Sequence, residues 1–319
     1  MTHTLVLGAT GFIGGHIARA AAGRGWQVRA ARRREGFTCA IGDLTVDWVH
    51  ADLNDRDSLA AAMSGVELVF HAAACYVHTS RHIGQHVAGA RAEMRRVLDA
   101  ARQAGVRRLI YTSTLATIGP AIDAGQPADE RSPYVPGSAG DAYHELKWAM
   151  EQDALSDGVP VVVLCPTIVF GPGDVHLSIS RPLLEIARGR VKFSIDGTVN
   201  VIDVRDAASA HVRAAHTGRP GERYILGGHN LSIQELIARA ARVAGVAPPR
   251  IGIPDVLLSL AGGLSRVLPG DPASLLRTRR LLQPFSNAKA VSELGLSPRP
   301  LEETVRDALD WFRAHDQLK

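Results

Sequence analysis

The stretch Thr4-Leu-Val-Leu-Gly8-Ala-Thr-Gly11-Phe-Ile-Gly14 decides the fold. An apolar strand over residues 4–7 runs directly into a G-x-x-G-x-x-G turn, and a helix over residues 14–22 is predicted to follow. In this order the backbone can approach a pyrophosphate, and the helix directs its N-terminal amides at the phosphates. We therefore predict a dinucleotide site that includes Gly8, Thr10, Gly11, Phe12, Ile13 and Gly14. The alternative is a glycine-rich turn that binds no ligand.

Short apolar segments alternate with helical ones through the first half of the chain. We predict strands over residues 4–7, 27–31, 48–51, 68–71, 108–112 and 159–164. We predict intervening helices over residues 14–22, 55–63, 85–104 and 143–155. Continuous apolar strands between helices are typical of a parallel sheet covered on both faces. The predicted fold class is therefore α/β, a doubly wound parallel sheet of the Rossmann type.

The pattern changes after Pro166, where loops rich in Gly and Pro are mixed with helices. The helices predicted there cover residues 181–188, 205–216, 232–244, 255–267 and 301–315, with a strand over residues 224–226. We predict that residues 1–165 form the nucleotide-binding domain. Residues 166–319 would form mainly a smaller, C-terminal substrate-binding lobe, with residues 198–227 returning to the first domain.

Composition limits the partners and the compartment. The chain has 319 residues and a formal net charge of +4, with Arg interleaved with Asp and Glu, so we expect no nucleic-acid partner. Cys39, Cys75 and Cys165 are far apart, which fits a reducing cytoplasm and no disulfide framework. No apolar run is long enough for a membrane span. His78, His82 and His86 have near metal-ligand spacing, but Gly84 disfavours one helix through them and we expect no metal.

The end of the second predicted strand discriminates between the two nicotinamide cofactors. An acid at this position accepts from the ribose hydroxyl of NAD, whereas an Arg accommodates the 2′-phosphate of NADP. Here Ala31 is followed by Arg32, Arg33 and Arg34, which favours NADP over NAD. The alternative is a solvated basic turn.

Two further segments are expected at the dinucleotide. Asp52 and Leu53 follow the third strand, where an acceptor can take the adenine amino group, or Asp52 is a capping or turn residue. His71, Ala72 and Ala73 follow the fourth strand, and small residues there let the dinucleotide lie close to the backbone.

Tyr143 and Lys147 open the helix predicted over residues 143–155. The i, i+4 spacing places phenol and ammonium on one face. A tyrosine becomes a usable acid/base near neutral pH only if a cation stabilises its phenolate, and Lys147 supplies one. Ser113 and Thr114 follow the fifth strand, where hydroxyls can bond a substrate oxygen. An exposed pair on a surface helix is the alternative.

Together these motifs resemble the extended short-chain dehydrogenase/reductase family over essentially the whole chain. Pro166-Thr-Ile-Val-Phe-Gly-Pro172 also falls in the family's order and spacing. Within the family, Gly221-Glu-Arg-Tyr-Ile-Leu-Gly-Gly228 is similar to the dihydroflavonol-reductase-like branch, which includes hopanoid-associated sugar epimerases.

The resemblance implies a role for each matching residue. Tyr143 would be the acid/base, and Lys147 would lower its pKa and hold the nicotinamide ribose. Thr114 would be the catalytic hydroxyl, with Ser113 as second candidate. Pro166, Thr167 and Ile168 would contact the cofactor. The family's Asn in an N-V-x-G-T stretch is here His86, and the effect of that change stays open. A homodimer is also implied.

The function favoured is that of an NADP-dependent carbonyl reductase or alcohol dehydrogenase acting on a small molecule. One alternative is a sugar-nucleotide epimerase or dehydratase of the same family. It is disfavoured because neither the loop around Cys165, Pro166 and Thr167 nor residues 199–204 supply the Arg that sugar-nucleotide members carry. A non-enzymatic NADP-binding regulator is the second alternative.

Overall fold

The computed structural model describes residues 2–34, 41, 43–73, 77, 79–177, 179–249, 251–253 and 282–318, with backbone only for 251–253. Cys39, Cys75, His78 and the helix predicted over residues 255–267 lie outside the described residues.

Among the described residues, seven parallel strands form the larger sheet, in the order β10-β6-β5-β4-β1-β2-β3. The strands are β1 (His3–Leu7), β2 (Gln27–Arg32), β3 (Asp47–His50), β4 (Leu68–His71), β5 (Arg108–Thr112), β6 (Val161–Pro166) and β10 (Arg223–Leu226). Parallel pairing brings their carboxyl ends to one edge, where the predicted site residues gather. The predicted doubly wound α/β fold is confirmed.

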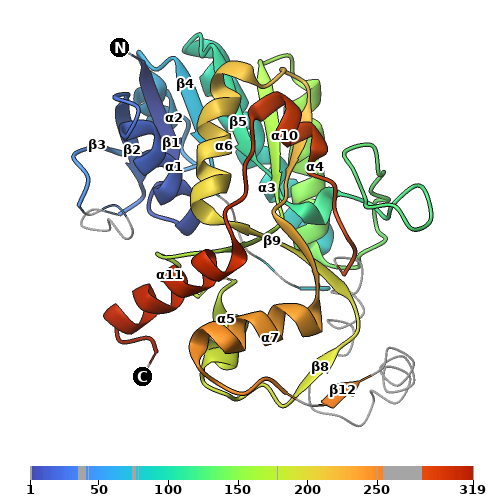
Figure 1. The fold of residues 1–319 in the computed structure, drawn as a ribbon. Coiled ribbons are helices and arrows are strands. Elements are labelled where there is room, and N and C mark those ends of the chain that lie inside the picture. The colour runs from blue at the N-terminus through green and yellow to red at the C-terminus, as the bar shows by residue number, and fades with distance from the viewer. Residues whose placement is uncertain are drawn as a thin grey trace.

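Helices cover both faces of the larger sheet (Figure 1). One face packs against α2 (Arg56–Met63), α3 (Ile83–Gln103) and α4 (Ala142–Ser156). The other packs against α1 (Phe12–Ala22), α6 (Val204–Thr217) and α10 (Ala288–Leu294). Because both faces are covered, β6 is buried along its whole length and its sequence is almost entirely apolar.

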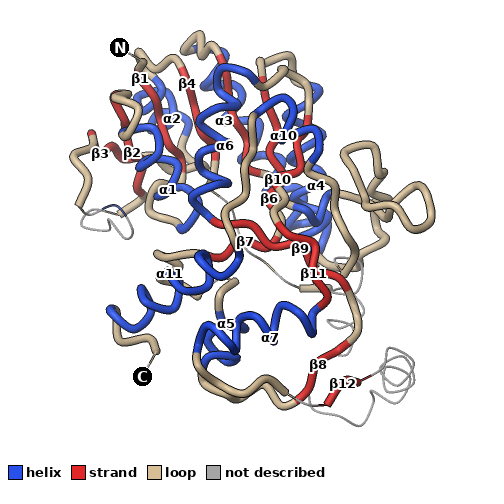
Figure 2. Tube along the Cα trace, in the orientation of Figure 1, coloured by secondary structure: helices blue, strands red, loops and turns tan. Residues whose placement is uncertain are grey.

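A second layer lies below the carboxyl edge of the larger sheet (Figure 2). A smaller sheet in the order β11-β9-β7 comprises β7 (Ile168–Phe170), β9 (Thr198–Asp203) and β11 (His229–Ser232). Helices α5 (Arg181–Ala187), α7 (Ile233–Ala244) and α11 (Leu301–Ala314) form a separate apolar core with it. A pair of short strands, β8 (Phe193–Ile195) and β12 (Ile251–Ile253), also belongs to this part.

The structure departs from the predicted elements after Pro166. Of residues 198–227, which we expected to return to the larger sheet, Arg223–Leu226 pairs there with β6, whereas Thr198–Asp203 lies in the smaller sheet. The pattern did not predict β7, β8, β9, β11, β12 or α10, because the pairing of these strands and the packing of this helix depend on partners distant in sequence. The domain bounds stay a prediction.

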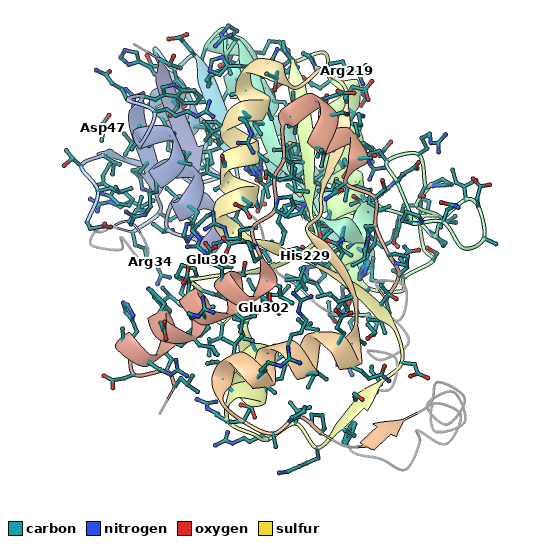
Figure 3. All side chains as sticks on the ribbon, viewed as in Figure 1. Arg34, Asp47, Arg219, His229, Glu302 and Glu303 are labelled. Atoms are coloured by element: carbon teal, nitrogen blue, oxygen red, sulfur yellow. The ribbon has the colours of Figure 1, made fainter. Side chains whose placement is uncertain are left out.

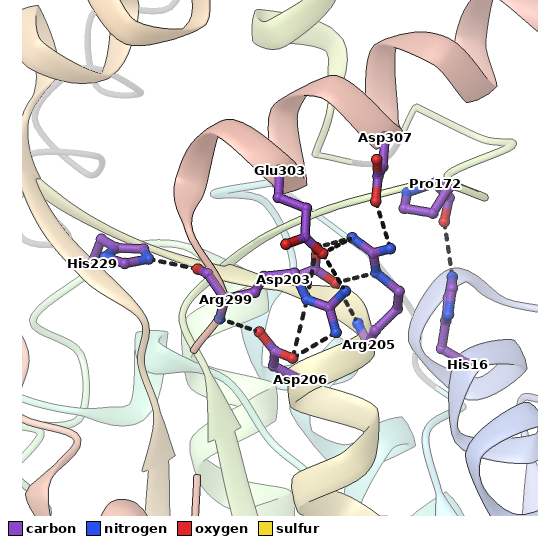
Figure 4. A network of polar contacts seen from close by, with 9 residues as sticks. All are labelled: His16, Pro172, Asp203, Arg205, Asp206, His229, Arg299, Glu303 and Asp307. Carbon is purple, nitrogen blue, oxygen red and sulfur yellow. Dashed lines mark hydrogen bonds and ion pairs between the residues drawn. The ribbon is translucent and has the colours of Figure 1, made fainter. Parts of the chain in front are cut away.

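An ion-pair network joins α11 to the start of α6 (Figure 4). Arg205 donates to the buried Asp203 and, at 2.6 Å, to Asp307 of α11. Arg299, just before α11, donates to Asp206 of α6 at 2.8 Å. The same end of α11 carries Glu302 and Glu303 (Figure 3). The network therefore fixes the C-terminal helix against a helix that covers the larger sheet.

Candidate active site

The glycine turn is folded tightly against the strand beside it. Gly8 has a φ of +87°, and a Cβ on it would lie 2.6 Å from the amide nitrogen of Ala73. A Cβ on Gly14 would overlap the carbonyl oxygen of Gly8. The turn is closed by a 2.9 Å hydrogen bond from the Gly11 amide to the Gly8 carbonyl. Only glycine fits at positions 8 and 14. Because these positions carry no side chain, a ligand can approach the backbone of the turn.

A cavity of about 470 Å³ opens beside this turn. The predicted cofactor residues that line it are Gly8, Thr10, Gly11, Arg32, Arg33, Asp52, Leu53, Ala72 and Ala73. They come from the turn after β1, the end of β2 and the segments after β3 and β4, so the parallel sheet collects distant segments around one space. Its lining combines a phosphate-binding turn, basic side chains and acceptors, which fits a dinucleotide.

Sequence reasoning missed six residues that line the same cavity. They are Leu7, Ala31, Ala51, Asn54, Glu93 and His176. Glu93 is on α3, and burial, the largest influence, raises the pKa of its carboxyl. His176 comes from the loop after β7, and its sequence neighbours gave no signal of a nucleotide site. Neighbouring Pro172 accepts a 2.8 Å hydrogen bond at its carbonyl from Nε2 of His16 on α1, which ties this loop to α1.

The predicted cation cluster and acceptor are held in defined positions. The guanidinium of Arg32 lies over the Trp48 ring, 5.0 Å from its centroid. Oδ1 of Asp52 accepts from the Asn54 amide at 2.9 Å, so Asp52 makes a turn as well as lining the cavity. Asp55, not Asp52, caps α2.

The remaining predicted cofactor residues do not line this cavity. Phe12 and Ile13 open α1, and Gly14 packs against the turn. Pro166 ends β6 and Ile168 begins β7, whereas the Thr167 hydroxyl donates to Asn200 at 2.8 Å. Their contact with a cofactor stays a prediction.

Tyr143 and Lys147 lie one turn apart on α4, whose first turn is fixed by its cap. Asp141 accepts from the Tyr143 amide at 2.9 Å. Lys147 is buried, with its ammonium donating to the Thr112 carbonyl at 2.8 Å and lying 4.6 Å from the Tyr111 ring centroid. Burial lowers the pKa of Lys147 to about 8. Tyr143 is partly exposed, so the pair combines an accessible phenol with a desolvated cation.

The hydroxyls at the end of β5 and just after it have different partners. Ser113 donates to Glu151 at 2.5 Å and is buried. Thr112 hydrogen-bonds His211. Thr114 is partly exposed, and its hydroxyl accepts from the Ala116 amide at 3.3 Å. Of the two predicted candidates, Thr114 is therefore the one open to a substrate.

The histidines near the site have separate environments. His71 is fully buried 5.4 Å from the Tyr111 ring, and burial lowers its pKa to about 3. Neither ring nitrogen of His71 hydrogen-bonds another described residue. His82 precedes α3 with a φ of +51°, so it does not share a helix face with His86. Among the described residues, no group of three His, Cys, Asp or Glu side chains is placed to hold a metal ion.

A second, more apolar cavity of about 320 Å³ adjoins the start of α4. It is lined by Ala116, Ile118, Gly119, Pro120, Tyr134, Val135, Ser138 and His144. His144 is the residue after Tyr143, and Ala116 follows Thr114 by two positions. The cavity therefore lies near the segments that carry Thr114 and Tyr143, although neither of these two residues lines it.

Comparison with known proteins gives the same class as the geometry. The model of the NAD dependent epimerase/dehydratase family matches residues 4–227. A putative dihydroflavonol 4-reductase of Synechocystis is 32% identical, covering 98% of this chain and 95% of its own length. Sterol demethylase protein B of Methylococcus capsulatus is 31% identical, with 99% of each chain covered. The crystal structure of a nucleoside-diphosphate-sugar epimerase from Pseudomonas aeruginosa is 28% identical over 100% of this chain and 99% of its own, with a TM-score of 0.85.

Fold and site thus define a Rossmann-type enzyme that binds a nicotinamide dinucleotide and acts on small molecules. The chain belongs to the NAD dependent epimerase/dehydratase family, within the extended short-chain dehydrogenases/reductases. Family members are enzymes, so the non-enzymatic alternative does not hold. Of the helices in the described part of the chain, none has the length and apolarity to cross a membrane.

Proposed function

We propose that the protein is an NADP-dependent carbonyl reductase in which Tyr143 donates the proton to the carbonyl oxygen. Lys147 holds a positive charge beside the phenol, and the Thr114 hydroxyl orients the substrate oxygen. The bound dinucleotide supplies the hydride. The observation that carries this proposal is the buried Lys147 ammonium, fixed to the Thr112 carbonyl one helical turn from Tyr143.

NADP is proposed because Arg32 and Arg33 both line the dinucleotide cavity at the end of β2. A guanidinium pairs with a phosphate through charge-assisted hydrogen bonds. Asp52 and Glu93 line the same cavity, so the 2′-phosphate must sit on the arginine side, away from these carboxyls.

An apolar carbonyl compound is the substrate class we favour. The second cavity, at the start of α4, is lined mainly by apolar groups such as Ile118, Pro120 and Val135. A relative named for a sterol supports this class. A sugar diphosphate would need cations, and none of the residues that line this cavity is Arg or Lys.

Epimerisation of a sugar nucleotide is the second candidate, favoured by the likeness to the Pseudomonas aeruginosa epimerase. An epimerase reduces and reoxidises its cofactor within one turnover, whereas a reductase releases NADP⁺ in each cycle. The motifs alone do not separate these two fates.

The test follows NADPH absorbance while the enzyme is offered ketosteroids, 3-oxo acids and aliphatic ketones. We expect absorbance to fall in proportion to alcohol formed. The same preparation is incubated with a sugar-nucleotide panel without added cofactor. If sugar nucleotides interconvert in that incubation, and no carbonyl compound causes NADPH to be consumed, the function is epimerisation and the reductase proposal is wrong.

A further inference from the structure

Glu151 lies on the same face of α4 as Tyr143 and Lys147, because the three residues follow at intervals of four. Its side chain is fully buried. Oε2 accepts hydrogen bonds from the Ser113 hydroxyl at 2.5 Å and the Thr117 hydroxyl at 2.7 Å. The carboxylate therefore accepts from two of the three hydroxyls that follow β5, those of Ser113 and Thr117 but not that of Thr114.

Arg223 of β10 forms an ion pair with the other oxygen of this carboxylate. Its Nη2 lies 3.0 Å from Oε1 of Glu151 and donates to both the carbonyl and the hydroxyl of Thr117 at 3.0 Å. The Cys165 thiol of β6 is 3.9 Å from Oε2 of Glu151, and burial raises its pKa to about 12. A carboxylate taken fully out of water costs several kcal/mol unless it is paired and hydrogen-bonded, and this one is both.

The carboxylate acts on Lys147 through a medium from which water is excluded. Burial is the largest influence on the Lys147 pKa and lowers it, while the negative charge of Glu151 raises it. The other titratable and charged groups that face this cluster are His71 of β4, Tyr111 of β5, Cys165 of β6, Arg223 of β10, Tyr143 of α4 and Glu130, whose charge acts on Arg223. Of the described groups that act on the Lys147 pKa, Glu151 and Cys165 favour the cation, and a thiol with a raised pKa is neutral at pH 7.

We propose that Glu151 is a positioning residue that keeps Lys147 charged beside Tyr143 and turns the Ser113 hydroxyl away from the substrate. The proposal rests on the acid/base roles proposed above for Tyr143 and Lys147. In this arrangement the Arg223 guanidinium pairs with the Glu151 carboxylate, with Nη2 3.0 Å from Oε1. Thr114 is left as the hydroxyl that faces the substrate.

The direct test measures the protonation of Lys147 by NMR of enzyme labelled with [6-¹³C]lysine. The chain has four lysines, Lys147, Lys192, Lys289 and Lys319, and Lys147→Arg assigns the resonance. We expect Glu151→Gln to lower the titration midpoint of Lys147 by about one pH unit, tenfold in the protonation equilibrium. Because Gln keeps the size of the side chain, the lost charge causes the shift.

Three further variants separate charge from structure. Thr117→Val removes a hydrogen bond to Glu151 at constant shape and should leave the midpoint unchanged. Glu222→Gln removes a carboxylate 2.6 Å from a different lysine, Lys289, and should leave the Lys147 midpoint unchanged. In Glu151→Gln, Arg223 loses its carboxylate partner, and this variant protein could fail to fold for that reason alone. The double variant Glu151→Gln/Arg223→Gln leaves no unpaired buried charge, and it should still lower the titration midpoint of Lys147.

A second readout is the pH profile of kcat/KM for NADPH-dependent reduction. Loss of either the Lys147 or the Tyr143 proton ends activity at high pH, so Glu151→Gln should move the alkaline limb to lower pH. An unchanged Lys147 midpoint in both Glu151 variants overturns the proposal. If wild-type enzyme reduces no carbonyl compound, the proposed function fails, whereas the NMR titration still decides the role of Glu151.

Discussion

The ammonium of Lys147 donates a 2.8 Å hydrogen bond to the carbonyl oxygen of Thr112. This bond ties α4 to the carboxyl end of β5, where the larger sheet presents its site residues. The ammonium is buried and held by this bond, and Tyr143 lies one turn earlier on the same helix.

Replacing Tyr143 by Phe should lower turnover at least a hundredfold, because the ring remains and only the proton donor is lost. NADPH affinity, measured by fluorescence titration, should stay nearly unchanged. A variant that retains most of its turnover would show that the proton comes from elsewhere, and His144 and His86 would be examined next.

NADPH should bind at least about tenfold more tightly than NADH, because an arginine–phosphate pair contributes roughly 1.5–3 kcal/mol. Arg32→Ala should narrow this ratio, as should Arg33→Ala. Calorimetric titration of both cofactors checks this expectation. Arg34→Ala is the matched control, since Arg34 is a neighbouring exposed arginine that does not line the cavity. Equal affinities in the wild type would sink the assignment.

Gly14→Ala should lower the free energy of unfolding by more than about 2 kcal/mol and weaken cofactor binding, because its Cβ overlaps the Gly8 carbonyl. Gly89→Ala is the matched control on α3, where a Cβ meets open space. That substitution should stabilise the helix by about 0.5–1 kcal/mol. Urea unfolding of both variants separates the steric effect from helix propensity. Equal stabilities would contradict the close approach.

The stability of the protein should fall in acid through Asp203. Burial raises the pKa of this carboxyl, but the Arg205 side-chain and backbone hydrogen bonds outweigh burial and hold it below its usual value. A lowered carboxyl pKa contributes stability above the unfolded-state pKa, near 4, that is lost as pH falls through the folded-state value.

Asp203→Asn keeps a capping side chain but loses the charge, so it should cost about 2 kcal/mol at pH 7. Its stability should also depend less on pH below about 4. Urea unfolding at several pH values measures both effects. Asp310→Asn, which removes an exposed partner of Arg313, should change stability by less than about 0.5 kcal/mol. A steep acid loss retained by Asp203→Asn would place the responsible carboxyl elsewhere.

The sequence by itself determined the larger sheet and the glycine turn. The strands Leu68–His71 and Arg108–Thr112 were predicted with their observed bounds, and the first half of the chain follows the predicted order. These features are local, since apolar runs, glycine spacing and the Tyr143–Lys147 interval are set by neighbours in the chain.

Only the tertiary structure decided which side chains meet. Ser113 and Thr114 are adjacent in sequence, yet one donates to the buried Glu151 and the other stays accessible. His176 reaches the dinucleotide cavity from a loop more than 100 residues beyond the fourth strand. The Glu151–Arg223 ion pair joins a helix to an edge strand 72 positions later. Such contacts depend on the packing of segments distant in sequence, and no local pattern encodes them.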